Sequence, residues 1–240
     1  MTSSIQDLKN ARVVVIGGTS GIGQAIALQA SAAGARVTVA SRNRQNVDKT
    51  AALLGPSASG DVVDLTDAAS TLKFFQKVGE IDHLILSGSQ LSAGAFRTSS
   101  VADAQASMNS KFWGPYSAVK AAKLAETGSV VLFSGLASRK PGMGKPIMTA
   151  INAAVDALGK ALAVELAPVR VNVVSPGVID TPLWAVPEEK RAEFLKSMTG
   201  RQSVSRAGRP DEIASVVMTM LTSTYMTGAV IDVDGGGLLV

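Results

Sequence analysis

Three glycines near the N-terminus have the spacing of a phosphate-binding turn. Gly17, Gly21 and Gly23 follow the apolar run 13–16 and precede a helical pattern over residues 24–30. We expect Gly17 to allow a tight turn, Gly21 to let the backbone approach a pyrophosphate, and Gly23 to let the helix pack closely. The helix N-terminus would present unpaired N–H groups and a positive dipole end to the phosphates. The pattern predicts a dinucleotide site formed by Gly17, Thr19, Ser20, Gly21, Ile22 and Gly23.

Two further residues indicate which dinucleotide would bind. Ser41 and Arg42 follow the second predicted strand, and Arg44 is close by. An NAD site usually carries Asp or Glu at this edge to hold the ribose 2′-hydroxyl, whereas Arg suits a 2′-phosphate. No acid stands here, so we predict NADP(H) as the cofactor. The alternative is that Arg42 is a solvated loop residue.

The elements that must position these residues alternate along the chain. The predicted strands cover residues 13–16, 35–40, 61–64, 82–86, 129–133, 170–174 and 230–233, and the longest predicted helices cover 102–126 and 147–166. Strands separated by helices predict one α/β domain over residues 1–240, a Rossmann-type, doubly wound, seven-stranded parallel sheet with helices on both faces. In such a sheet the ligand binds beyond the carboxyl ends of the strands.

The composition of the chain argues against disulfides, metal sites, membrane spans and nucleic-acid binding. The chain has no cysteine and one histidine, so we expect neither disulfides nor a metal site. We find no apolar run of about 20 residues, and therefore expect no membrane span. Residues 1–10 are polar and lack the apolar region of a leader, which favours a cytoplasmic protein. The net charge of +4 comes from scattered Lys and Arg, so no nucleic-acid partner is expected.

The chain resembles the short-chain dehydrogenases/reductases over essentially its whole length. The glycine turn matches, although Ile16 stands where the family usually has Thr, and the closing segment 225–236 matches as well. The resemblance implies that Asp64 and Leu65 hold the adenine. It also implies that the Pro-Gly motif after the sixth strand holds the nicotinamide amide and a phosphate, through the backbone near Ile179 and the hydroxyl of Thr181. The motif residues are Pro176, Gly177, Ile179 and Thr181.

The catalytic positions of that family are changed here. The family usually carries an Asn on the fourth helix, a Ser after the fifth strand, and Tyr-x-x-x-Lys on the following helix. An ungapped alignment of helix 147–166 puts Met148 at the Tyr position and Asn152 at the Lys position. The Ser position falls on Gly135, with Ser134 just before it. Lys111 replaces the Asn, and we expect it to reach the cofactor ribose or the substrate oxygen. In the altered loop after the fourth strand, the residues expected near the cofactor are Ser87, Gly88 and Ser89.

Three other side chains fit a catalytic pattern only superficially. Tyr116 and Lys120 have the Tyr-x-x-x-Lys spacing, but they lie on the fourth helix, before the fifth strand, so we assign them to a surface or interface. His83 lies inside a predicted strand, where a packed or hydrogen-bonded residue is expected rather than a base.

Two functions remain open at this point. Methionine has no proton to donate, so a reaction would need Lys111, Ser134 and Asn152 as its catalytic groups. The first function is an NADP(H)-dependent oxidoreductase that acts on a carbonyl or alcohol of an apolar small molecule. The second is a catalytically silent NADP(H)-binding protein, either a sensor or a structural subunit.

The resemblance also implies a substrate lid and self-association. Residues 182–206 correspond to the family's lid, and four apolar side chains could form the substrate pocket or simply belong to the core: Phe112, Met143, Met148 and Trp184. Family members are commonly dimers or tetramers built on the fourth and fifth helices, so a homodimer or homotetramer is expected.

Overall fold

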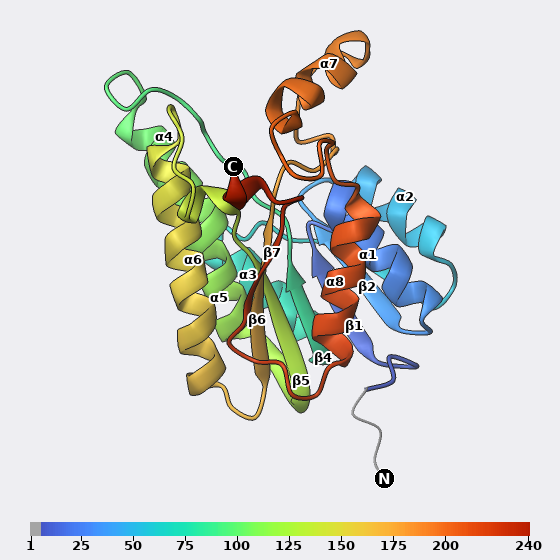
Figure 1. The fold of residues 1–240 in the computed structure, drawn as a ribbon. Coiled ribbons are helices and arrows are strands. Elements are labelled where there is room, and N and C mark those ends of the chain that lie inside the picture. Colours follow the sequence, from blue (N-terminus) through green and yellow to red (C-terminus); the bar gives the residue numbers. More distant parts are fainter. Residues whose placement is uncertain (1–5) are drawn as a thin grey trace.

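A computed structural model describes residues 6–240 as a seven-stranded, entirely parallel sheet, drawn in Figure 1. Residues 1–5 lie outside the described residues; they belong to the polar segment 1–10 from which a cytoplasmic location was expected. The strand order is β3-β2-β1-β4-β5-β6-β7, so the chain reverses its direction of winding between β1 and β4. The predicted doubly wound fold is confirmed. Its strands are β1 (Arg12–Ile16), β2 (Arg36–Ser41), β3 (Ser59–Val62), β4 (Glu80–Leu86), β5 (Lys123–Phe133), β6 (Arg170–Pro176) and β7 (Val230–Val233).

Helices cover both faces of the sheet (Figure 1). Side chains of β1 alternate between two cores because successive residues of a strand point to opposite faces. Val13 and Val15 join the core under α1, α2 and α8, whereas Val14 and Ile16 join the core under α3, α5 and α6. These helices are α1 (Gly21–Ala32), α2 (Arg44–Leu54), α3 (Ala68–Val78), α5 (Gly114–Ala121), α6 (Pro146–Glu165) and α8 (Pro210–Thr222).

The predicted helix 102–126 was wrong at its C-terminal end. The chain forms α4 (Val101–Met108), a π-helical turn (Asn109–Trp113) and α5, which ends at Ala121. Residues from Lys123 onward pair in parallel with β4, beginning opposite Glu80. This tertiary pairing overrides the local helical preference of the segment.

The third strand was also placed too late in the chain. β3 pairs with β2 from Ser59 opposite Thr38, so the predicted 61–64 is shifted by two residues. Asp64 consequently lies in the loop after β3, at the edge of the sheet where ligands bind in this fold.

Helix α6 is long and apolar enough, by length and composition alone, to cross a membrane, with a mean hydropathy of 1.4. The sequence prediction did not anticipate this. In the structure α6 covers the sheet: Ile151 and Val155 are buried, and a Cβ added at Gly159 would lie 2.2 Å from Cγ2 of Val173 in β6. Glycine at this position allows the helix and the strand to approach closely.

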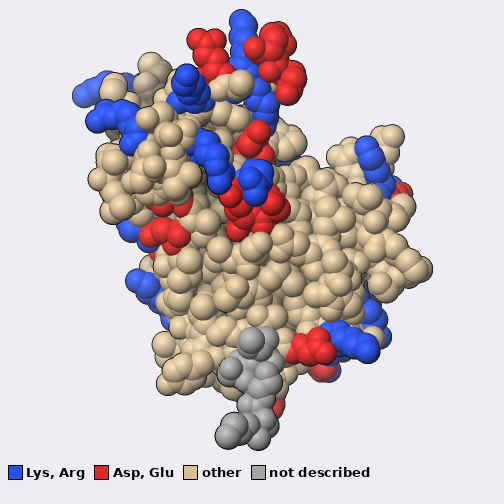
Figure 2. Space-filling view, turned by 45° about the vertical axis from the view of Figure 1, so that its right-hand side comes forward, with Lys and Arg blue, Asp and Glu red and all other residues tan. Residues whose placement is uncertain are grey.

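Helix α7 (Glu188–Thr199) projects from the rest of the molecule at the top of Figure 1. Its sequence mixes acidic and basic residues, and Figure 2 shows blue and red side chains interleaved over this region. The helix belongs to the segment 182–206, which the sequence identifies as a lid.

Candidate functional site

The glycine turn after β1 is shaped by close contacts between backbone segments. Gly17 has a φ of +81°, and a Cβ added there would lie 2.3 Å from the backbone N of Gly88. A Cβ at Gly23 would lie 2.2 Å from the carbonyl oxygen of Gly17, so the start of α1 packs against the turn itself. Larger residues at either position would displace backbone. The turn therefore depends on glycine at positions 17 and 23.

The N-terminus of α1 faces this turn without an internal partner. Its N-cap residue, Ser20, makes no side-chain capping hydrogen bond, and the first turn of the helix carries no acidic residue. Free N–H groups and a positive dipole end favour an anion at this point. The geometry suits a pyrophosphate.

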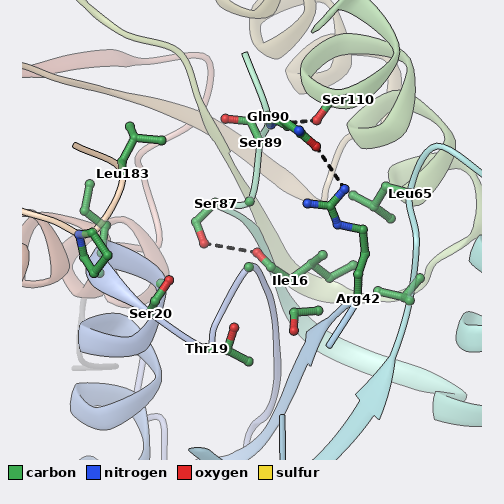
Figure 3. Close-up of a pocket in the computed structure, with 18 of the residues that line it drawn as sticks. Ile16, Thr19, Ser20, Arg42, Leu65, Ser87, Ser89, Gln90, Ser110 and Leu183 are labelled. Atoms are coloured by element: carbon green, nitrogen blue, oxygen red, sulfur yellow. Dashed lines mark hydrogen bonds between the residues drawn. The ribbon is translucent and has the colours of Figure 1, made fainter. Parts of the chain in front are cut away.

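A groove of about 380 Å³ runs along the carboxyl ends of β1, β2 and β4 (Figure 3). The predicted residues that line it are Gly17, Thr19, Ser20, Gly21, Ile22, Gly23, Ser41, Arg42, Asp64, Leu65, Ser87, Gly88, Ser89 and Thr181. The sequence analysis missed Ile16, Val63, Thr66, Gln90, Ser110, Pro182 and Leu183. Most of the missed residues are direct neighbours of predicted ones, so a window around each strand end would have found them. Four predicted cofactor residues do not line the groove: Lys111, Pro176, Gly177 and Ile179.

Arg42 reaches into the groove without a carboxylate partner. Its Nη1 donates a hydrogen bond of 3.0 Å to Oε1 of Gln90, and over residues 6–240 it forms no salt bridge. Arg44 is different, because it pairs with Asp48 and Asp61 and is therefore engaged elsewhere. Of these two arginines, Arg42 is therefore the one without a salt bridge at the predicted ribose position.

Asp64, the predicted adenine contact, is held in its ionised form. The hydroxyl and backbone N–H of Thr66 both donate to its carboxylate, and these bonds, with the nearby charge of Arg42, hold the pKa of Asp64 below its usual value. Its carboxylate is thus a fixed hydrogen-bond acceptor at the edge of the groove.

The segment after β6 folds down toward the glycine turn. A Cβ added at Gly21 would lie 3.2 Å from Cβ and Cγ2 of Thr181. Trp184 Nε1 donates a 2.7 Å hydrogen bond to the carbonyl of Ile179, and Arg191 of α7 donates a 2.7 Å bond to the carbonyl of Thr181. The family resemblance places the backbone near Ile179 at the nicotinamide amide, and the Ile179 carbonyl in that backbone already has an internal partner.

Lys111 lies in the π-helical turn, and its ammonium is buried. Its Nζ donates a 2.9 Å hydrogen bond to the carbonyl of Ser134 at the end of β5. Burial lowers the pKa of Lys111 to about 8, and the charge of Asp156 opposes that shift only partly. The side chain borders a cavity of about 10 Å³, whose other walls are Leu86, Ser87, Gly88, Ser89, Pro115, Leu132, Phe133 and Val155.

Asn152 occupies the space that glycine leaves open at position 135. A Cβ added at Gly135 would lie 3.1 Å from Nδ2 of Asn152. Oδ1 of Asn152 and Oγ of Ser134 are both buried and have no hydrogen-bond partner in the part of the chain that is described. Unsatisfied buried polar atoms are uncommon and require an explanation, which a bound polar group would provide. The structure thus gathers Lys111, Ser134 and Asn152 around the end of β5.

The side chains set aside in the sequence analysis lie away from this cluster. Tyr116 is on the outer surface of α5, where its ring stacks on Phe112, and it does not line the groove. His83 is buried and hydrogen-bonds Ser129 through Nδ1 at 2.9 Å, and burial lowers its pKa to about 4. Met143 is fully exposed, so its predicted place in an apolar pocket was wrong.

These features fit the phosphate groups of a dinucleotide. The glycine-rich turn, the open helix N-terminus and the guanidinium of Arg42, which has no salt bridge, would hold the pyrophosphate and a further phosphate. The residues present therefore fit the cofactor that the sequence predicts.

Comparison with known proteins agrees with this geometry. A family model described as enoyl-(acyl carrier protein) reductase matches residues 17–237. The chain is 31% identical to the short-chain dehydrogenase/reductase ATR9 of Stachybotrys chlorohalonatus, over 97% of this chain and 98% of that protein. It is 30% identical to L-xylulose reductase of Bos taurus, over 96% and 98% of the two chains.

Solved structures show the same likeness. A small-chain dehydrogenase in complex with NADPH is 36% identical, with a TM-score of 0.85 over 97% of this chain and all of the other. The MalC reductase/Diels-Alderase of Malbranchea aurantiaca is 25% identical, with a TM-score of 0.89 over 97% of this chain and 98% of that one. The chain therefore belongs to the short-chain dehydrogenase/reductase family of oxidoreductases, which use NAD(P).

Proposed function

We propose that the protein is an NADP(H)-dependent oxidoreductase that acts on a carbonyl or alcohol of an apolar small molecule. The observation that carries the cofactor assignment is the guanidinium of Arg42, which enters the groove beside Ser41 and forms no salt bridge with any described carboxylate. A carboxylate is what a 2′-hydroxyl site would require, and an arginine is what a 2′-phosphate would require.

The reaction site would use the cluster at the end of β5. Reduction of a carbonyl adds a hydride to carbon, which the reduced nicotinamide supplies, and a proton to oxygen. The Lys111 ammonium has three N–H donors, and the carbonyl of Ser134 accepts one. A second donor is free to bind the substrate oxygen and deliver the proton. Leu86, Leu132 and Phe133 line the cavity beside Lys111, which at about 10 Å³ would have to widen before an apolar substrate could enter.

Cofactor choice is tested by measuring the affinity of NADPH and NADH for the wild-type protein and for Arg42→Asp. One charge-assisted hydrogen bond is worth about 1.5–3 kcal/mol, so the substitution should weaken NADPH binding roughly ten- to hundredfold. NADH binding should change little, because NADH has no 2′-phosphate. Equal affinity of the wild-type protein for the two cofactors would refute the assignment.

A second function is a catalytically silent NADP(H)-binding protein. Both tyrosines of the chain lie outside the site, Tyr116 on the surface of α5 and Tyr225 fully exposed. The cavity beside Lys111 has room for about one water molecule. A scan of carbonyl compounds with NADPH separates the two functions. If any compound causes the protein to oxidise NADPH, the protein is an enzyme. If NADPH binds but no compound is turned over, the sensor or structural subunit is favoured.

The proposal includes self-association and a cytoplasmic location. Trp113, Tyr116 and Val164 expose large apolar surface on the helices that family members use to form dimers or tetramers. Light scattering on a sizing column should therefore give the mass of a homodimer or homotetramer.

We also propose that residues 182–206 act as the substrate lid, since Pro182 and Leu183 already line the groove.

A further inference from the structure

Gln90 joins the two sides of the groove at the predicted adenosine end. Its Oε1 accepts the 3.0 Å hydrogen bond from Nη1 of Arg42, which follows β2. Its backbone N–H donates a 2.8 Å hydrogen bond to Oγ of Ser110, in the π-helical turn. Figure 3 shows the three residues in a row across the groove, with Leu65 beside the guanidinium. An arginine on an exposed loop is therefore tethered to a helix that lies on the other side of the ligand site.

The chemistry of the tether leaves the arginine able to bind an anion. A guanidinium has five N–H donors in a rigid fork, and the amide of Gln90 accepts only one. Because glutamine is neutral, it fixes the position of Arg42 without cancelling its charge. A glutamate in its place would form a salt bridge and compensate the guanidinium.

We propose that Gln90 is a positioning residue that prearranges Arg42 for the 2′-phosphate of NADP(H), with Ser110 as its anchor. An untethered arginine would have to lose side-chain freedom when the phosphate binds, and that loss lowers affinity. The tether restricts the side chain beforehand. The inference rests on the proposed NADP(H) dependence, and it assigns part of the cofactor selectivity to a residue outside the loop that carries Arg42.

The test is calorimetric titration of the full chain with NADPH, NADH and adenosine 2′,5′-bisphosphate. The bisphosphate carries the 2′-phosphate but no nicotinamide, so it reports on this end of the groove without turnover. Gln90→Leu removes the acceptor, and Gln90→Glu replaces it with a charge. Gln76→Leu, at an exposed position of α3, is the matched control.

Gln90→Leu should weaken binding of NADPH and of the bisphosphate about two- to tenfold, the range of one modest hydrogen bond, and leave NADH binding unchanged. Gln90→Glu should weaken the two phosphate ligands further, because its carboxylate pairs with Arg42 and repels the phosphate. Ser110→Ala should act in the same direction as Gln90→Leu with a smaller effect, and Gln76→Leu should have none. Unchanged NADH binding also shows that each variant is folded.

Two results would overturn the inference. If the wild-type protein prefers NADPH and Gln90→Leu keeps the full preference, Gln90 has no positioning role, while the proposed function stands. If Gln90→Leu binds NADPH more tightly, Gln90 competes with the phosphate for Arg42. A wild-type protein that does not discriminate NADPH from NADH refutes the cofactor assignment itself, and this inference with it.

Discussion

Burial of the Lys111 ammonium should make the stability of the protein depend on pH in a defined window. Below about pH 8, Lys111 is charged in both the folded and the unfolded chain, and the folded chain carries the cost of its desolvation. Between about pH 8 and 10.5 the folded chain has released this proton and the unfolded chain has not, so the free energy of unfolding rises with pH. Above that range both states are neutral.

The size of this rise follows from the lowered pKa. A decrease from 10.5 to about 8, at roughly 1.4 kcal/mol per pH unit, adds about 3 kcal/mol to the free energy of unfolding across the window. Lys111→Met keeps most of the side-chain stem and removes the titrating group, so its stability should lack this rise. The variant loses both the hydrogen bond to Ser134 and the desolvation cost of the ammonium, and with no titrating group at this position neither change gives its stability a slope in this window.

The measurement is urea unfolding of the cofactor-free protein at intervals from pH 7 to 10.5. Other groups titrate in the same range, so the informative quantity is the difference between the wild-type protein and Lys111→Met at each pH. Lys120→Met, the same substitution at an exposed position of α5, is the control and should follow the wild type. Parallel curves for the wild type and Lys111→Met would refute the buried-ammonium interpretation.

Three further results are expected. If Lys111 donates the proton, turnover should fall as the pH rises through about 8, because the ammonium is lost. A turnover rate that is constant from pH 7 to 9 would count against Lys111 as the proton donor. Gly21→Ala should prevent NADPH binding in a titration. Because the backbone at this position has a φ of +52°, which strains an alanine, the substitution should also lower the free energy of unfolding by about 1–2 kcal/mol. Tyr116→Phe should leave turnover and NADPH affinity unchanged, and a loss of turnover would instead make Tyr116 and Lys120 the catalytic pair.

The parts of the fold that could be predicted are those that local sequence determines. Apolar β-branched runs specified the strands around Val14 and Val173, and the glycine spacing specified the turn, because each depends on residues close together in the chain. The end of α5 could not be predicted in this way. Lys123 becomes a strand residue only by pairing with Glu80, far away in the sequence.

The same distinction applies to the candidate site. Most residues that follow strands were found, since the parallel sheet brings its carboxyl ends to one edge. The contact between Trp184 and the Ile179 carbonyl was missed, because it depends on how the lid folds back. Neither the spacing nor the type of Gln90 indicated its bond to Arg42, although its place just after Ser89 could have marked it.

The contact between Gly17 and Gly88 affects which parts of the site can be changed by substitution. These glycines bring the loops after β1 and β4 together with no side chain between them, so the width of the groove is set by the main chain. Substitutions at Lys111, Gly135 or Asn152 alter the groups that meet the substrate and leave that width as it is. The cofactor end can therefore stay fixed while the groups at the reaction end are exchanged.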